Sequence, residues 1–305
     1  MQGSKLKKKE SRTALLFVSP FIIGFLLFNL YPIAMSLYYS FTDFSVLSSP
    51  HWIGISNYKK LFGDALFWKS IKNTLYITVI GVPLTTVVAL LTAMLLNRKT
   101  KGVGIFRTLI YIPAVVPPVA ATLLWTWMLN PKYGSINSML KLIGIKGPGW
   151  LADYRWAKPA ILLMLVWAIG ETMILYLASL QDVPRELYEA CELDGANKFQ
   201  VFIHITIPFI KPVIFYNVVT GIICMSQFFT QAYVVGSKGG SNAGLGAPNN
   251  STLFYCLYLF KNGFGFLKMG YASAMAWLLL IFALIVTWLL LKYTGFFSDD
   301  KTGAR

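Results

Sequence analysis

Six long apolar segments constrain this chain more than any other feature. The hydrocarbon core of a bilayer is about 30 Å thick, so a helix that crosses it needs roughly 20 mainly apolar residues. Six stretches reach this length, at about residues 14–41, 71–96, 106–129, 159–180, 206–235 and 271–293. Only 13% of the residues are charged, against about 25% in soluble domains. We therefore predict an all-α, polytopic membrane protein whose six transmembrane helices form a single domain over residues 1–305.

The distribution of basic residues predicts the orientation. Lysine and arginine are dense at 5–12, before the first segment, and at 98–107, between the second and third. Such clusters stay on the cytoplasmic side of a membrane. The first apolar stretch is too long for a cleaved secretory signal, so we expect a retained anchor. Both termini, and the link between the fourth and fifth segments, are then expected in the cytoplasm.

The net charge of +15 raises the question of nucleic-acid binding. The basic residues lie in short clusters beside apolar segments, which is the pattern of membrane flanks, so we expect none. Three cysteines, Cys191, Cys224 and Cys256, stand far apart, and the chain has two isolated histidines. We predict no metal site, no disulfide framework and no catalytic residues, because no constellation of ligands or of nucleophile and base is visible.

Prolines interrupt several of the apolar segments, and the third segment, "IYIPAVVPPVAATLLWTWML", is the richest in them. Each proline removes a helix hydrogen bond. In lipid the freed carbonyl must find a neighbouring helix or a polar cavity. The sequence therefore predicts a packed bundle with bent helices, in which the third span is the most distorted.

The link at about residues 182–208, which we call the elbow, is polar and is predicted to fold as two short helices. Pro184 suits a first helical turn, Gly195 ends the first helix, and Asn197 can cap a second helix that presents Phe199 and Phe202. An acidic stripe recurs every third residue, at Glu186, Glu189 and Glu192. Such a stripe can be a solvated helix face. Aromatic residues beside charge on a rigid support also suit docking into a groove of a partner.

The elbow resembles the EAA loop in the membrane subunits of ATP-binding-cassette (ABC) importers. The spacing is carried by Glu189, Ala190, Gly195, Ile205 and Pro208. Two positions depart from the usual motif, since cysteine 191 replaces a second alanine and isoleucine 207 replaces leucine. Further stretches, including "FVSPFIIGFLLFNLYPIAMSLYYSFTDF" and "LKMGYASAMAWLLL", extend the resemblance over nearly the whole chain. It is similar to the sugar-transporting branch of this family, and in particular to the membrane subunits of maltose transporters.

This resemblance implies a type I importer permease fold in a bacterial inner membrane. The implied partners are a second homologous permease in a heterodimer, two ATPase subunits and an extracytoplasmic sugar-binding protein. ATP and Mg would bind to the ATPases, and this chain would be a non-catalytic subunit without a cofactor. The elbow would be the coupling helix that contacts the ATPase, a role that falls on Glu189, Ala190, Asp194, Gly195, Ala196, Phe199 and Pro208.

Two regions are candidates for substrate contact. Glu171 lies mid-way along the fourth segment, where an ionisable residue is costly. It either makes a helix–helix hydrogen bond or faces a polar cavity or another subunit. Its position resembles the sugar-contact position of the family, as do those of Trp167 and Ala168. The fifth segment mixes aromatic and polar side chains, which suits stacking on a sugar and bonding to its hydroxyls. Its candidates are Met225, Ser226, Gln227 and Phe229.

The expected cargo is a neutral oligosaccharide, and glycerol phosphate or a polyol remain open as alternatives. An ion-coupled secondary transporter would usually show internal repeats, and none is clear in this sequence. Such a transporter would also leave the elbow without a role. Gly239 and Gly240 resemble a turn of the family, with Ser241 in place of its proline, and this loop could contact the binding protein.

Overall fold

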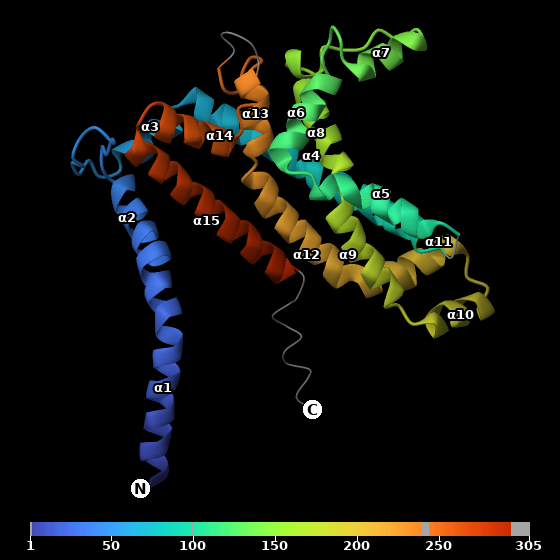
Figure 1. Ribbon diagram of the computed structural model, residues 1–305, viewed down its shortest axis with the longest axis horizontal. Helices are drawn as coiled ribbons and strands as arrows, with labels where there is room; N and C mark the ends of the chain where they lie inside the picture. The colour runs from blue at the N-terminus through green and yellow to red at the C-terminus, as the bar shows by residue number, and fades with distance from the viewer. Residues whose placement is uncertain (1, 99–100, 239–243, 294–305) are drawn as a thin grey trace. The chain divides into compact units, whose positions relative to one another are not determined.

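The computed structural model describes residues 2–98, 101–238 and 244–293, and these residues form helices and connecting loops with two isolated β-bridges. They divide into two compact units (Figure 1). The first unit holds the chain up to Asp64 together with Leu259–Ile281, and the second holds Ala65–Tyr258 and α15 from Phe282 onward. The predicted turn at residues 239–241 lies outside the described residues.

The predicted spans are present as helices. Four segments are long and apolar enough to cross a membrane alone, namely Thr13–Ser40, Ala65–Leu96, Lys198–Ser237 and Met269–Lys292. Two bent pairs also qualify, α5 (Val103–Val115) with α6 (Pro118–Met128) and α8 (Ala157–Trp167) with α9 (Gly170–Gln181). If each pair is one crossing, the described residues contain up to six spans, one in each predicted segment. The prediction of an all-α, polytopic fold is confirmed.

The two bends have different causes. The pair α5 and α6 is bent by 100°, where Val116 and Pro117 adopt extended backbone conformations. A proline pushes the residue before it out of the helical region, so this break follows from the sequence. It confirms the prediction that the third span is the most distorted. The pair α8 and α9 is bent by 46° at Ala168 and Ile169, where no proline stands, and the sequence did not predict this bend.

The first unit is built from helices at both ends of the chain. Its elements are α1 (Gln2–Phe25), the π-helical turn η1 (Leu26–Leu30), α2 (Tyr31–Ser40), α3 (Ser56–Phe62), η4 (Lys261–Gly265) and the first half of α15 (Met269–Tyr293). The Gly270 N–H donates to the Phe44 carbonyl at 2.9 Å. The Tyr271 hydroxyl donates to Asp64 Oδ2 at 2.8 Å. These bonds fasten the start of α15 to the loops on either side of α3.

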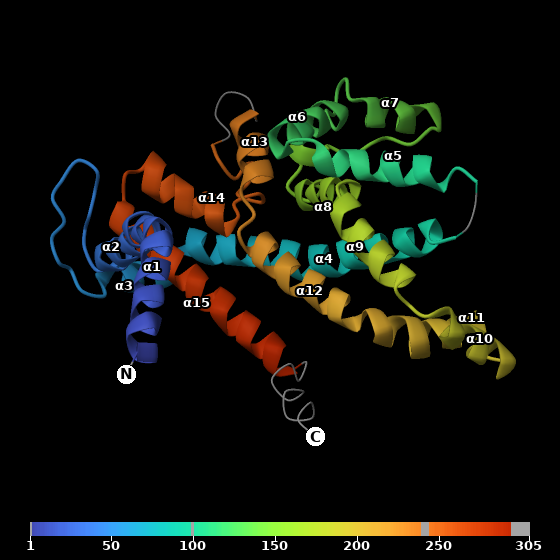
Figure 2. The same ribbon diagram turned by 60° about the horizontal axis from the view of Figure 1, so that its bottom comes forward.

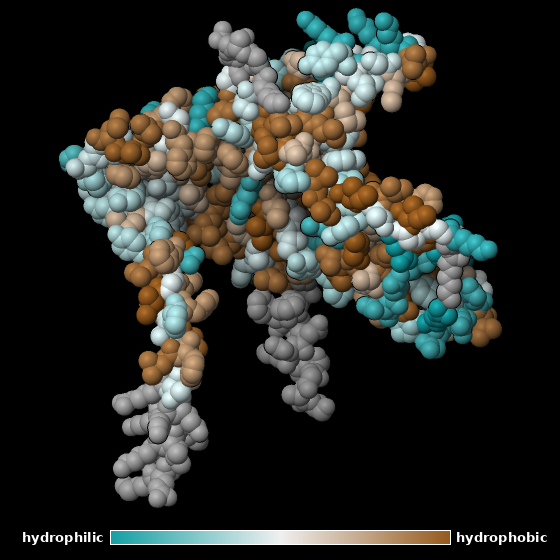
Figure 3. All heavy atoms as spheres, in the orientation of Figure 1, coloured by the Kyte–Doolittle hydropathy of each residue, from teal (hydrophilic) through white to brown (hydrophobic). Residues whose placement is uncertain are grey.

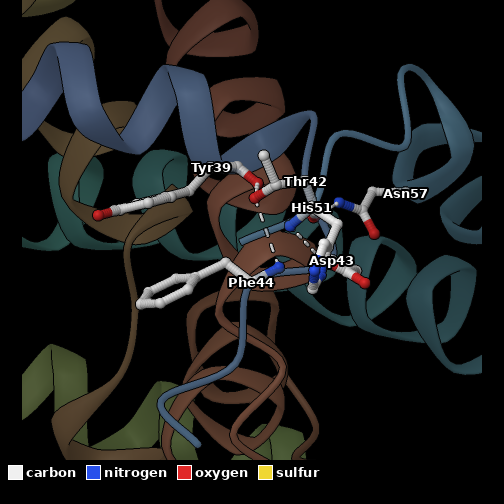
Figure 4. A network of polar contacts seen from close by, with 6 residues as sticks. All are labelled: Tyr39, Thr42, Asp43, Phe44, His51 and Asn57. Atoms are coloured by element: carbon white, nitrogen blue, oxygen red, sulfur yellow. Dashed lines mark hydrogen bonds and ion pairs between the residues drawn. The ribbon is translucent and has the colours of Figure 1, made fainter. Parts of the chain in front are cut away.

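The loop after α2 is held by a compact polar network (Figure 4). Asn57 is buried, and its Nδ2 donates to the carbonyls of Ser40 and Thr42 at 2.9 and 2.8 Å. The His51 backbone N–H donates to Asp43 Oδ1 at 2.8 Å, and His51 Nδ1 lies 3.6 Å from the same oxygen. The Asn57 side chain thus supplies donors to two carbonyls that the end of α2 leaves without helical partners. The chain can therefore turn back after α2 without leaving these carbonyls unsatisfied.

The second unit is organised around α4 (Ala65–Leu96), which packs against α8, α9 and α12 (Ile207–Ser226) (Figure 2). Helix α5 packs on α9, and α6 packs on α13 (Thr230–Lys238). The remaining elements are α7 (Ser135–Leu142), η2 (Trp150–Ala152), α10 (Arg185–Leu193), α11 (Lys198–Val201), η3 (Phe202–Thr206) and α14 (Tyr255–Phe260), which ends in the first unit. One apolar core joins α4, α9 and α12, through side chains such as Ala93, Met173, Tyr176 and Ile210.

Candidate functional site

The elbow holds two helical segments after α9, and the second of them runs on through η3 into α12 without a break. The first, α10, runs from Arg185 to Leu193, and the second, α11, from Lys198 to Val201. Figures 1 and 2 both place the two helices together beyond the adjacent ends of α9 and α12. Figure 3 shows hydrophilic residues gathered over this part of the molecule. The predicted arrangement of helix, glycine and helix is therefore present.

A tight turn joins α10 to α11. Gly195 has a left-handed backbone, with φ at +76°. Its N–H donates to the Glu192 carbonyl at 3.1 Å, and the Ala196 N–H donates to the Cys191 carbonyl at 2.9 Å. This pair of bonds is a Schellman motif. A Cβ at position 195 would meet no atom within 4 Å, so the backbone conformation alone, and not space, demands glycine here.

A reciprocal cap begins α11. Asn197 Oδ1 accepts hydrogen bonds from the backbone N–H groups of Phe199 and Gln200 at 3.0 and 2.9 Å. Gln200 Oε1 in turn accepts from the Asn197 N–H at 2.8 Å. This capping box satisfies donors that the first turn of a helix leaves free. Since both ends of the turn are fixed by local bonds, the angle between the two helices is well defined.

The outer surface of the elbow is both acidic and apolar. Glu186, Glu189 and Glu192 are exposed, and no ion pair among the described residues engages them. Leu193 and Phe199 are 90% and 69% exposed. Of the other predicted coupling residues, Ala190, Asp194 and Pro208 are exposed and Ala196 is half-buried. Exposed apolar side chains beside unpaired acids favour a docking surface over a simply solvated face.

The base of the elbow is anchored in the core. Phe202 was expected on the exposed surface, but it is half-buried and packs against the core shared by α4, α9 and α12. It points inward because one face of η3 and of the start of α12 lies against this core, where Ile205 and Ile207 pack beside it. Tyr188 packs on the same core, and its hydroxyl lies 3.3 Å from Thr206 Oγ1. Sequence reasoning missed Tyr188, although it falls on the less acidic face of α10.

A cavity of about 270 Å³ lies between the two bent helix pairs. It is lined by residues at both bends and by one residue of α13. Three of the predicted substrate residues, Trp167, Ala168 and Glu171, meet there, together with Gln231. The lining is mainly apolar, and Thr122, Glu171 and Gln231 are among its few polar side chains.

Close packing holds Glu171 at the cavity. Glu171 lies in the first turn of α9, where the positive end of the helix favours a carboxylate. The preceding residue, Gly170, faces α5, and a Cβ there would come within 2.9 Å of Tyr111 Cα and 3.0 Å of the Ile110 carbonyl oxygen. Glu171 itself is exposed, and its carboxylate accepts none of the hydrogen bonds seen between described residues. The arrangement favours the cavity-facing alternative over a helix–helix hydrogen bond.

Trp125 is a residue of the cavity that sequence reasoning missed. Its ring meets that of Trp167 edge to face, with centroids 5.8 Å apart and an interplanar angle of 83°. Its Nε1 is buried and has no hydrogen-bond partner among the described residues. An unsatisfied buried donor costs about 1–3 kcal/mol, which an acceptor on a ligand could recover. Trp125 stands in a mainly apolar stretch, so no local pattern marked it.

The four candidates of the fifth segment are placed differently. Met225 and Phe229 are half-buried and pack against an apolar cluster that includes Phe228. Ser226 is buried, and its hydroxyl donates to the Ile222 carbonyl at 2.7 Å. Gln227 is exposed at the end of α12. From this stretch it is Gln231 that lines the Glu171 cavity. Among the described residues, no group of three His, Cys, Asp or Glu side chains could hold a metal ion.

The fold, the elbow and the cavity between broken spans together define a membrane subunit of a transporter. Residues 81–293 match the family described as "Binding-protein-dependent transport system inner membrane component". This match covers well over half of the chain, and the chain belongs to that family. It is an ABC transporter permease, a non-catalytic transport component of the inner membrane, as the resemblance of the elbow implied.

Full-length relatives agree with this assignment. The chain is 39% identical over 299 residues to the probable ABC transporter permease protein YesP of Bacillus subtilis, covering 97% of this chain and 94% of YesP. It is 36% identical to the lactose transport system permease protein LacF of Rhizobium radiobacter, and the match covers 94% of this chain and 95% of LacF. A crystal structure of a bacterial ABC transporter involved in alginate import contains a chain with the same fold. The TM-score is 0.79 at 24% sequence identity, and the superposition covers 98% of this chain and 99% of the chain in that structure.

Proposed function

We propose that this chain is one of two homologous permease subunits of an ATP-driven importer that moves a carbohydrate, most simply an oligosaccharide, across the inner membrane. Two ATPase subunits would bind ATP and Mg, and an extracytoplasmic binding protein would deliver the sugar. The elbow and both termini would face the cytoplasm. The observation that carries the proposal is the elbow itself, an exposed acidic and apolar surface rooted in the core.

Helix α9 connects the elbow to the cavity at Glu171. Near its end, Leu177 and Leu180 belong to the core against which the elbow packs, and its first turn places Glu171 in the cavity. The helix has 12 residues, which at 1.5 Å per residue gives about 18 Å. Because packed interiors resist deformation, a displacement of the elbow by closing ATPases would be carried by α9 to the cavity. This is a two-state element biased by nucleotide.

The chemistry of the cavity supports a sugar as cargo. Trp125 and Trp167 offer ring surfaces for stacking, and Glu171 and Gln231 offer groups that bond hydroxyls. The name of LacF, a relative over nearly its whole length, includes lactose. We propose Trp167, Ala168 and Glu171 as substrate contacts, with Trp125 and Gln231 added. For Met225, Ser226, Gln227 and Phe229 a substrate role stays a prediction, which the contacts within the single chain do not test.

The coupling role can be tested at Glu189. Glu189→Arg reverses the charge at the middle of the acidic stripe, so we expect it to abolish ATP-driven uptake while the protein remains folded and membrane-inserted. The measurement is sugar uptake into proteoliposomes that contain both permeases, the ATPases and the binding protein. Asp182→Arg is the matched control, because Asp182 is also exposed but precedes α10. Normal uptake by Glu189→Arg would show that this carboxylate is not a coupling residue.

The same vesicles test the energy source. Uptake should require ATP inside the vesicle and should vanish when the ATPase subunits are left out. Uptake driven by an ion gradient without any ATPase would overturn the proposed function and restore the secondary-transporter alternative.

A further inference from the structure

A second and larger pocket, of about 730 Å³, lies beside the elbow and is lined by three arginines. Arg98 follows the end of α4, Arg107 lies in α5, and Arg185 begins α10. The lining contains no acidic residue, and none of the three arginines forms an ion pair with a described residue. Three arginines that line one pocket without an acidic residue favour the binding of an anion there.

The backbone and the buried part of Arg107 add to this positive potential. Helix α5 has 13 residues, and its N-cap residue Gly102 and first helical residues Val103 and Gly104 form part of the pocket wall, without a side-chain cap. The amino end of such a helix carries a partial positive charge and free N–H donors. Arg107 Nη2 donates to the Leu96 carbonyl at 3.0 Å, whereas its Nε is buried and has no partner among the described residues.

The position of the pocket points to a lipid as the source of the anion. Three membrane spans end at its rim, since α4 ends at Leu96, α5 begins at Val103 and α9 ends at Gln181. The rim therefore lies at the membrane surface, at the depth of phospholipid head groups. On α5, Ile105, Leu109 and Ile112 are exposed and share one helix face, because they are spaced by four and three residues. Figure 3 shows a hydrophobic surface along this helix, on which acyl chains can lie.

We propose that this pocket binds the phosphate of an anionic phospholipid whose acyl chains lie along the exposed face of α5. Basic pockets between helices at a membrane surface take such head groups. The bound phosphate bridges Arg185 of the elbow to Arg98 and Arg107 on the neighbouring spans. It thereby holds α10 against the bundle. This inference concerns lipid and not cargo, so it stands or falls separately from the proposed function.

The test is native mass spectrometry of the full-length chain, purified in detergent and mixed with phosphatidylglycerol or phosphatidylcholine. Wild-type protein is expected to retain phosphatidylglycerol in preference to phosphatidylcholine. The double variant Arg98→Gln/Arg185→Gln is expected to retain about 25-fold less, at roughly fivefold for each basic group. Arg107 is kept because it caps α4. The matched control is Lys141→Gln/Lys146→Gln, which removes the same charge from exposed residues in and after α7.

The experiment distinguishes lipid binding from two alternatives, binding of a soluble anion and docking of a protein. Unchanged phosphatidylglycerol retention in the arginine double variant, or equal retention of phosphatidylcholine by the wild type, would overturn the proposal. Displacement of the lipid by an equal concentration of glycerol 3-phosphate would assign the pocket to a soluble anion. If the double variant loses ATPase binding but keeps its lipid, the arginines serve protein docking. A thermal shift assay on each variant verifies that a lost lipid does not reflect an unfolded protein.

Discussion

Replacing Gly195 with valine is expected to uncouple the elbow while leaving the rest of the protein folded. The residue has φ at +76° and no neighbour within 4 Å of a would-be Cβ. Valine would therefore meet no steric contact there, and the whole effect comes from forcing a β-branched residue into the left-handed region. The strain is confined to a turn on the protein surface.

The size of the effect follows from the bonds of the turn. The two hydrogen bonds of the Schellman motif, at 3.1 and 2.9 Å, contribute about 1 kcal/mol each in net terms. Backbone strain for valine in the left-handed conformation is about 3 kcal/mol, which exceeds the roughly 2 kcal/mol from the two bonds. A turn in which both bonds are broken is therefore favoured over the native turn by about 1 kcal/mol. At this balance about one molecule in six keeps the native elbow. Asparagine tolerates the left-handed conformation, and alanine is strained by about 1–2 kcal/mol. Activity should fall in the order Gly, Asn, Ala, Val.

The assay is ATP-driven sugar uptake in proteoliposomes, and Gly195→Val should reduce it about sixfold. The matched control is Gly144→Val, because Gly144 has φ at +78°, equally open surroundings and a position after α7, away from the elbow. This control should transport normally, since it carries the same local strain without touching the coupling surface. Wild-type uptake by Gly195→Val, or an equal loss in Gly144→Val, would refute the reasoning.

Three further predictions concern single side chains. Glu171→Ala should impair sugar uptake while ATPase binding to the permease stays at the wild-type level in pull-down, and unchanged uptake kinetics would make Glu171 structural. Trp125→Phe keeps a ring but removes the buried Nε1 donor, so the KM for sugar-stimulated ATPase activity should rise at least about fivefold at unchanged kcat, which corresponds to the lower end of about 1–3 kcal/mol. An unchanged KM would contradict this. Burial raises the pKa of the Cys256 thiol to about 11, so in the folded protein its maleimide labelling, followed by peptide mass spectrometry, should keep rising with pH through pH 10. In denaturant the labelling should be half-maximal near pH 8.5, because the thiol returns to its ordinary pKa of about 8.5. Half-maximal labelling near pH 8.5 in the folded protein would disprove the shift.

Much of the elbow was predictable because its structure is decided within a few residues. The glycine at 195 is needed by the backbone of one turn, and Asn197 caps α11 through bonds to residues two and three positions away. The break in the third span likewise follows from consecutive prolines at 117 and 118. The spans themselves follow from the length of apolar sequence that a bilayer requires.

Other features needed the tertiary structure because they join residues far apart in the chain. Asn73 on α4 donates to the carbonyls of Asn250 and Leu253, a contact across 177 and 180 residues that no local pattern signals. The bend at Ala168 lies beside Gly170, which sits close against α5, and Phe202 packs on the core of α4, α9 and α12.

The sequence alone determined the number and nature of the spans, the two-helix elbow and, by resemblance, the class of protein, since periodicity, caps and motif spacing are short-range. Only the tertiary structure decided which side chains meet. It brought Trp125 and Gln231 to Glu171, and it set Arg98, Arg107 and Arg185 around one pocket. The reason is physical: a cavity or a charge cluster belongs to the packing of several helices, and side chains of one chemical type look alike in the sequence until packing selects those that face it.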